Sequence, residues 1–174
     1  ELSSEFRVVT LDLRGAGNSG KTPDGHSLSG YAADLAELLA HLDVEDAVVV
    51  GYAMGLSVAV HYLVAYGLTR AAGLVWVDHS PRFYRTPGWP YALFGDLTPQ
   101  QFDETIRGLW HDRPAAARDL LQVMFQTPES WMYDEVMKTP TEVAAAMLAA
   151  VAATDLRPLL PELDLPTLLV NGRN

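Results

Sequence analysis

Four short apolar runs recur along the chain and predict four β-strands. They span residues 6–13 (FRVVTLDL), 47–50 (AVVV), 72–77 (AGLVWV) and 166–170 (PTLLV). Continuous apolar runs of this length, with many β-branched residues, are typical of strands that are buried on both faces.

Each of the first two runs is followed by a segment that is predicted to be a helix. Over residues 31–42 the apolar side chains recur on one face, and Ser29 is placed to cap the start of this helix. A second helix follows Gly55, and Gly67 is suited to end it because glycine readily adopts the left-handed C-cap conformation. This alternation predicts an α/β fold with a mostly parallel sheet and flanking helices.

The pattern changes between the third and fourth runs, where residues 83–154 indicate helices only. Thr98, Thr127 and Thr139 each precede a proline, which places Thr at a helix cap and Pro at the first helical position, and another helix is expected near Pro114. Such an insert between two strands predicts a helical lid over the carboxyl edge of the sheet. We therefore expect the core over residues 1–82, the lid over 83–154 and a return to the core over 155–174.

Aromatic and methionine side chains are frequent in the predicted lid and suit the roof of an apolar pocket. Each of them could equally belong to the core of the insert itself. The residues expected to line a substrate pocket are Tyr52, Trp89, Phe94, Trp110, Phe125 and Met132.

Composition narrows the possible partners. The 174 residues are 49% hydrophobic, enough for one sizeable core, and 12 basic against 22 acidic residues give a net charge of −10. This charge disfavours binding to nucleic acid or to anionic membranes. The absence of cysteine excludes disulfides and thiolate metal sites. Because no apolar run approaches 18 residues and no signal-like region begins the chain, we expect a cytoplasmic location.

Two rival kinds of site are disfavoured by their surroundings. Residues 15–20 (GAGNSG) match the dinucleotide pattern Gly-x-Gly-x-x-Gly, but that motif must open a helix, and KTPDGH follows instead. The five histidines, which lack the spacing of metal ligands, are His26, His41, His61, His79 and His111. No metal is therefore expected, while the role of His79, directly after a strand, stays open.

The order of the motifs resembles the α/β-hydrolase superfamily over nearly the whole chain. Residues 8–19 (VVTLDLRGAGNS) are similar to the family's fourth strand and the Asp-x-Arg-Gly-x-Gly-x-Ser loop that follows it. Residues 51–55 (GYAMG) are similar to the nucleophile elbow Gly-x-Ser-x-Gly. Residues 75–81 (VWVDHSP) and 166–172 (PTLLVNG) are similar to the strands before and after the lid. The resemblance implies the α/β-hydrolase fold and no cofactor.

In the family's elbow the nucleophile occupies a strained turn between a strand and a helix. The resemblance gives Ala53 the nucleophile position, gives Met54 the backbone N–H that binds the oxyanion, and leaves Gly51 and Gly55 to keep the turn clear. A methyl group cannot attack an acyl carbon, so the chain as written should not run nucleophilic acyl transfer. Either Ala53 replaces a serine, which the otherwise intact elbow favours, or a natural relative has lost hydrolysis.

The resemblance also makes Asp78 the candidate acid of a catalytic triad, because no carboxylate follows the last strand. The alternative is an aspartate that caps or anchors its loop. The family's base histidine, second oxyanion donor and third strand have no counterpart in these residues. We therefore expect a segment of a longer polypeptide, whose remainder completes the sheet and supplies the histidine.

The function implied by the resemblance is a serine-type hydrolase that acts on a small-molecule ester, thioester or lactone with an apolar body, inactivated at position 53. One alternative is a non-hydrolytic protein on the same fold that binds a small molecule. Another is a cofactor-free oxygenase, lyase or isomerase. Serine or alanine at this position in the natural gene would distinguish the first two, and residual turnover of the alanine form would favour the third.

Overall fold

The computed structural model describes residues 2–172 and contains a three-stranded parallel sheet. The strands are β1 (Ala47–Tyr52), β2 (Ala71–Val77) and β3 (Thr167–Val170), in the spatial order β1-β2-β3. The α-helices are α1 (Leu28–His41), α2 (Met54–Tyr66), α3 (Pro99–His111), α4 (Arg113–Met124), α5 (Ser130–Met137) and α6 (Thr141–Ala152). Two 3₁₀ turns complete the elements, η1 (Leu2–Ser4) and η2 (Leu160–Glu162). The predicted α/β fold with a parallel sheet is confirmed.

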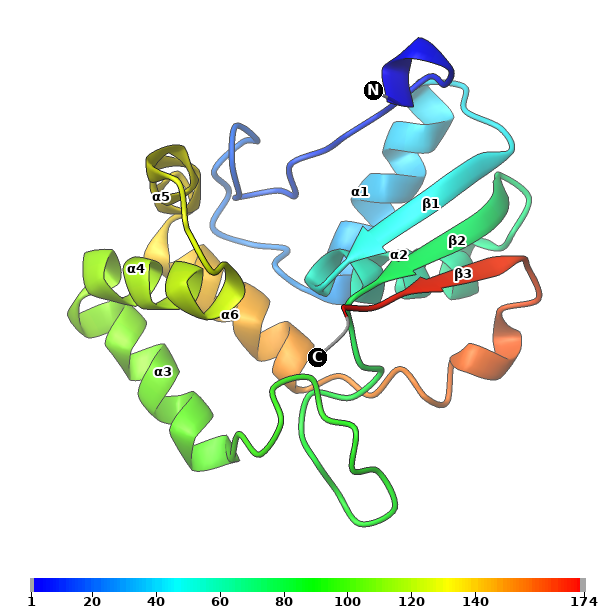
Figure 1. Ribbon diagram of the computed structural model, residues 1–174. Coiled ribbons are helices and arrows are strands. Elements are labelled where there is room, and N and C mark those ends of the chain that lie inside the picture. Colours follow the sequence, from blue (N-terminus) through cyan, green and yellow to red (C-terminus); the bar gives the residue numbers. More distant parts are fainter. Residues whose placement is uncertain (1, 173–174) are drawn as a thin grey trace.

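Helices α1 and α2 cover one face of the sheet (Figure 1). The core lies between these layers, where Leu56, Leu63 and Leu74 are almost completely buried. The strands are parallel because α2 carries the chain from the end of β1 back to the start of β2. Their carboxyl ends therefore meet at one edge, on the side where α3–α6 lie (Figure 1).

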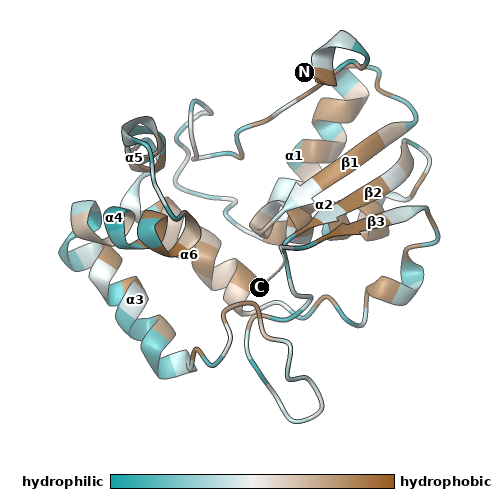
Figure 2. Cartoon of the chain, viewed as in Figure 1, coloured by the Kyte–Doolittle hydropathy of each residue, from teal (hydrophilic) through white to brown (hydrophobic). Residues whose placement is uncertain are grey.

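The predicted strand over residues 6–13 is wrong. This segment is irregular, and Phe6 and Val8 remain 63% and 49% exposed. Among residues 2–172 no strand lies beside it, so its backbone N–H and C=O groups have no ladder to join. Within residues 2–172 the outer edge of β1 is also unpaired, and Val48 and Val50 are 60% and 64% exposed. Figure 2 shows that β1 is largely hydrophobic.

The helix caps correct one prediction and confirm another. Ser27, not Ser29, caps α1, because its Oγ accepts the N–H of Gly30 at 3.0 Å. Ser29 instead lies in the first turn, with its hydroxyl 3.1 Å from that of Ser27. Gly67 ends α2 with φ 80°, as predicted.

Only part of the capping chemistry predicted for the later helices is present. Thr98 caps α3 in a reciprocal capping box with Gln101, and Pro114 lies in the first turn of α4, as predicted. Thr127 and Thr139 are not caps. Pro140 has ψ 151°, which is outside the helical range, so α6 starts only at the next residue.

Residues 83–98 are irregular rather than helical, which corrects the expectation of helices from residue 83. The helical segment α3–α6 is nevertheless joined to the sheet layer by a second apolar cluster. In this cluster Phe83 and Phe102 meet edge to face, with ring centroids 5.2 Å apart, and pack with Tyr31 and Val58 of α1 and α2. No helix in the described part of the chain is both long and apolar enough to cross a membrane.

Candidate active site

The turn between β1 and α2 is strained at Ala53, which has φ 46° and ψ −124°. Positive φ is unusual for a residue with a Cβ and costs about 1–3 kcal/mol, so the surrounding structure must hold it in place. The N–H of Ala53 donates to the carbonyl of Val77 at 3.3 Å, and its own carbonyl accepts the N–H of Leu56 at 3.0 Å. The predicted strained turn at position 53 is confirmed.

The two elbow glycines differ in what surrounds them. A Cβ on Gly51 would lie 2.5 Å from Cα of Leu56, so only glycine lets α2 fold back this closely over β1. A Cβ on Gly55 would meet no heavy atom of the described residues within 4 Å. The expectation of a close approach is therefore right for Gly51 and wrong for Gly55, which faces open space.

Met54 is the first residue of α2, so its backbone N–H has no acceptor within the helix. The N–H groups at a helix start carry partial positive charge and favour a negative ligand. The Met54 side chain packs against the second apolar cluster and leaves the backbone group at the turn. This geometry is compatible with an oxyanion donor beside position 53.

Asp78 directly follows β2 and also has positive φ, 46°. Its N–H donates to the carbonyl of Val170 at 2.9 Å. Asp78 is exposed at the carboxyl edge of the sheet, on the strand next to the elbow strand. The hydrogen bond between Ala53 and Val77 brings the nucleophile position next to the start of this loop.

A shallow hollow of about 420 Å³ opens beside Asp78. It is lined by Asp78, His79, Ser80, Pro81, Trp89, Tyr91, Ala92, Leu93 and Asn171. The segment from Trp89 to Leu93 precedes α3, so the hollow lies between the sheet edge and the approach to the helical segment.

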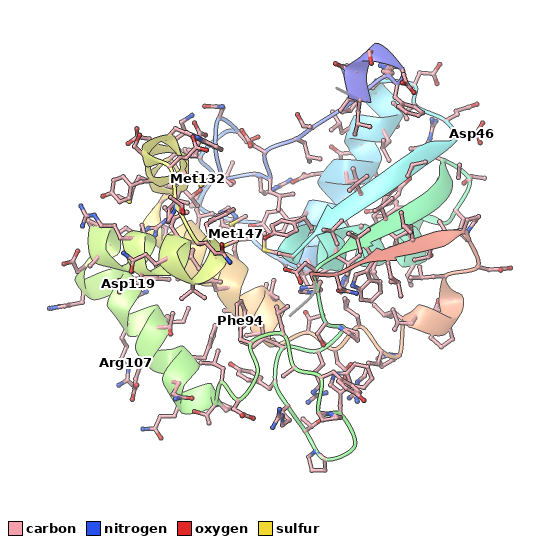
Figure 3. The ribbon with its side chains drawn as sticks, in the orientation of Figure 1. Asp46, Phe94, Arg107, Asp119, Met132 and Met147 are labelled. Atoms are coloured by element: carbon pink, nitrogen blue, oxygen red, sulfur yellow. The ribbon has the colours of Figure 1, made fainter. Side chains whose placement is uncertain are left out.

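Of the predicted pocket residues only Trp89 lines this hollow. The structure does not bring Tyr52, Phe94, Trp110, Phe125 and Met132 to it. Trp110 is 60% exposed because Phe102 and Leu109 occupy the buried face of α3. Phe94 contacts the ring of Phe83 instead, and Figure 3 places Phe94 and Met132 on separate parts of the chain.

A contact that sequence reasoning missed joins α2 to the loop after β2. Ser57 is 1% exposed, and its Oγ lies 3.1 Å from Nε2 of His79. Burial lowers the pKa of His79 from 6.5 to about 4, although the neighbouring Asp78 carboxylate opposes this shift. One signal was available: Ser57 stands four residues after Ala53, near the start of the helix that follows the turn.

The glycine-rich loop at residues 15–20 has no helix behind it, since α1 begins only at Leu28. The Asp12 carboxylate fills its centre and accepts the N–H of Asn18 at 2.8 Å. A Cβ on Gly17 would lie 2.4 Å from that carboxyl group. A carboxylate held here would repel a pyrophosphate, which disfavours a dinucleotide site in this loop.

Metal-ligating side chains are dispersed in the described residues. Within residues 2–172, no group of three histidine, aspartate or glutamate side chains is close enough together to hold a metal ion.

Comparison with known proteins gives a family match over the whole chain. A family model described as alpha/beta hydrolase fold matches residues 1–174. The AB hydrolase superfamily protein YisY of Bacillus subtilis is 28% identical, over 97% of this chain and 63% of its own length. The bifunctional esterase/perhydrolase DCH of Acinetobacter calcoaceticus is also 28% identical, over 99% of this chain and 66% of its own length. The chain thus spans slightly less than two thirds of these relatives.

Solved structures agree on the fold. The hydrolase olei00960 from Oleispira antarctica is similar with a TM-score of 0.84 and 25% identity, over 97% of this chain and 63% of its own.

Proposed function

Because the chain belongs to the α/β-hydrolase family, we propose that the full polypeptide is a serine-type hydrolase in the form that has serine at position 53. The proposed substrate is a small-molecule ester, thioester or lactone with an apolar body. The observation that carries this proposal is the backbone of Ala53, with positive φ at the turn between a buried strand and a helix. A strained turn of this kind presents a serine hydroxyl at the edge of an α/β sheet.

In the proposed mechanism a serine at position 53 attacks the acyl carbon. The N–H of Met54, at the positive end of α2, stabilises the oxyanion that forms. Asp78 orients a histidine supplied by residues outside this chain, and that histidine takes the serine proton and delivers it to the leaving group. Water, which gives a proton to the same histidine, then attacks the acyl carbon; the bond to the serine oxygen breaks, the histidine returns the proton to that oxygen, and the acid is released.

Residues around the hollow support an apolar acyl or alcohol part in the substrate. Trp89, Tyr91 and Leu93 supply apolar surface beside Asp78. Trp89 is held in place, since its Nε1 donates to the carbonyl of Tyr91 at 2.9 Å and the Arg157 guanidinium lies 5.3 Å from its ring centre. A fixed aromatic wall favours apolar groups over strongly hydrated ones. The helical segment α3–α6 then serves as the lid.

The test is restoration of the hydroxyl in the full polypeptide that carries this sequence. Ala53→Ser adds one oxygen to a turn already shaped for it, and turnover of a short-chain p-nitrophenyl ester should rise by several orders of magnitude. Ala53→Gly is the matched control, because it relaxes the positive φ without supplying a nucleophile, and it should stay inactive. A serine form as inactive as the glycine form on esters, thioesters and lactones would contradict the proposal.

A second candidate function is binding without hydrolysis, and Ala53 itself favours it because the turn keeps its strained shape without a hydroxyl. In that case the alanine is native and the protein is a small-molecule receptor on the hydrolase fold. Alanine at this codon in the natural gene, together with an inactive serine form that still binds an apolar ligand in calorimetry, would select this candidate. Turnover by the unchanged alanine form would instead select a cofactor-free oxygenase or lyase.

A further inference from the structure

The backbone at Asp78 is held from both sides. Before the strained φ, the N–H of Asp78 donates to Val170 of β3. After it, the carbonyl of His79 accepts a hydrogen bond from Nε1 of Trp76 at 2.8 Å. A non-glycine residue in this conformation persists only where its neighbours determine it.

The side chain of His79 provides a third attachment, and this one reaches the elbow helix. Its Nε2 lies 3.1 Å from Oγ of Ser57. Ser57 is one turn after position 53 in α2. The bond therefore connects the residue next to the candidate acid with the helix that begins at the candidate nucleophile.

This serine and histidine are not a nucleophile and its base. Ser57 is 1% exposed, so no substrate reaches its hydroxyl. The imidazole is largely buried, which disfavours its charged form, and its Nδ1 has no hydrogen-bond partner in the part of the chain that the structure describes. A neutral ring fixed by a buried hydroxyl is suited to holding geometry rather than to moving protons.

We propose that Ser57 and His79 are a positioning pair, which fixes the Asp78 backbone at a set place relative to α2 and thereby relative to position 53. The inference rests on the proposed function in taking Asp78 as the acid. Without the bond, the residues after Asp78 are no longer joined to the body of α2, and the hydrogen bond from Ala53 to Val77, on the side before Asp78, is the link that remains to the turn. Asp78 can then move relative to the nucleophile while the sheet stays intact.

The structure supplies a pair of histidine variants that separate the bond from the ring. Gln places its terminal amide near the position of Nε2, so His79→Gln can still bond to Ser57. Asn is one carbon shorter, so His79→Asn cannot reach that hydroxyl. Ser57→Ala removes the same bond from the other side, and His41→Asn at the exposed end of α1 is the matched control for histidine loss.

Kinetics are measured in the full polypeptide carrying Ala53→Ser. Ser57→Ala and His79→Asn should each lower kcat by about 10- to 100-fold with KM little changed, because misplaced catalytic groups lose rate rather than binding. His79→Gln should recover most of this loss, and the double variant Ser57→Ala/His79→Asn should be no worse than either single one. Loss of kcat in the glutamine variant equal to that in the asparagine variant would overturn the proposal.

A second measurement does not depend on activity. In the protein with Ala53 unchanged, Ser57→Ala should speed hydrogen exchange of the Asp78 N–H by about 5- to 10-fold, as expected for losing one hydrogen bond. The N–H of Leu74, which bonds to Pro166 near the other end of the same strand pair at 2.9 Å, should change little. If Ala53→Ser is inactive, but Ser57→Ala speeds hydrogen exchange at the Asp78 amide and not at the Leu74 amide, the hydrolase proposal fails and the positioning pair stands. Equal changes at both amides, or none at Asp78, would refute the pair.

Discussion

The backbone N–H of Ala53 donates a hydrogen bond to the carbonyl oxygen of Val77, with 3.3 Å between the two atoms. This bond joins the turn after β1 to the residue that precedes Asp78. Ala53 and Asp78 both have φ 46°, so the two strained residues stand at the ends of neighbouring parallel strands. Ligands of α/β proteins bind at this edge of the sheet, and backbone strain there is commonly linked to function.

The first prediction concerns the glycine that lets α2 cross β1 closely. Gly51→Ala places a Cβ 2.5 Å from Cα of Leu56, so the helix must shift, and the free energy of unfolding should fall by about 1–3 kcal/mol. Gly55→Ala is the control in the same turn, where the added methyl meets open space and should be neutral or slightly stabilising. Urea unfolding of the full polypeptide measures both, and equal losses would contradict the close crossing at Gly51.

The second prediction tests Asp78 as the acid in the Ala53→Ser form. Asp78→Asn keeps the shape of the side chain and tolerates positive φ, so the fold should remain, but kcat should drop by about 10⁴-fold because the histidine loses its orienting charge. Asp46→Asn is a matched control, since Asp46 also has positive φ (55°) but precedes β1, away from the helical segment (Figure 3). Ester turnover is measured for both variants, and a similar rate for Asp78→Asn and Asp46→Asn would contradict the role of Asp78 as the acid.

Local chemistry made much of this fold predictable from the sequence. The N-cap at Thr98 and the C-cap at Gly67 depend on residues a few positions apart, and both are as expected. The strained turn at Ala53 was predictable from the resemblance of residues 51–55 to the family's nucleophile elbow, which is a short local motif. Such features need no knowledge of distant contacts.

The errors lie where distant contacts decide. Residues 6–13 have the composition of a strand, but a strand also needs a partner, which sequence composition does not report. Packing against the rest of the protein buries the face of α3 that carries Phe102, and Trp110 lies on the exposed face. The bond between Ser57 and His79 required knowing how closely α2 passes the loop after β2. Each of these outcomes belongs to tertiary packing rather than to local pattern.

The third prediction concerns the dependence of stability on pH. The pKa of His79 falls from 6.5 to about 4 on folding, chiefly because the ring is buried. Between these pH values the unfolded chain binds a proton that the folded protein does not, so stability should be complete above pH 6.5 and decline as pH falls toward 4. The loss is at most about 3 kcal/mol. His79→Gln should flatten this part of the pH profile measured by urea unfolding, and His41→Gln should not; an unchanged slope in His79→Gln would contradict the buried neutral ring.

The last prediction concerns the ion cluster that joins the two ends of the segment from Arg82 to Asp155. The Asp155 carboxylate pairs with Arg82 on the entering chain and with Arg157 at 2.6 Å on the leaving chain. The N–H of Leu156 also donates to the carbonyl of Pro81 at 2.8 Å, so both crossings lie side by side. Hydrogen bonds, first from Arg157 and then from Arg82, hold the pKa of Asp155 well below its usual range.

Because this pKa is lowered in the folded state, the stabilisation should be present above the usual carboxyl range and be lost as pH falls below it. Asp155→Asn removes the charge at neutral pH and should cost about 1 kcal/mol, since solvent screens part of the attraction. The amides of α3–α6 should then exchange faster, while those of α1 and α2 should not. Asp119→Asn, at an exposed position of α4, is the matched control (Figure 3). Hydrogen exchange by mass spectrometry separates the two, and an equal response to both variants would mean that general charge loss, rather than the joined crossings, governs how α3–α6 is held.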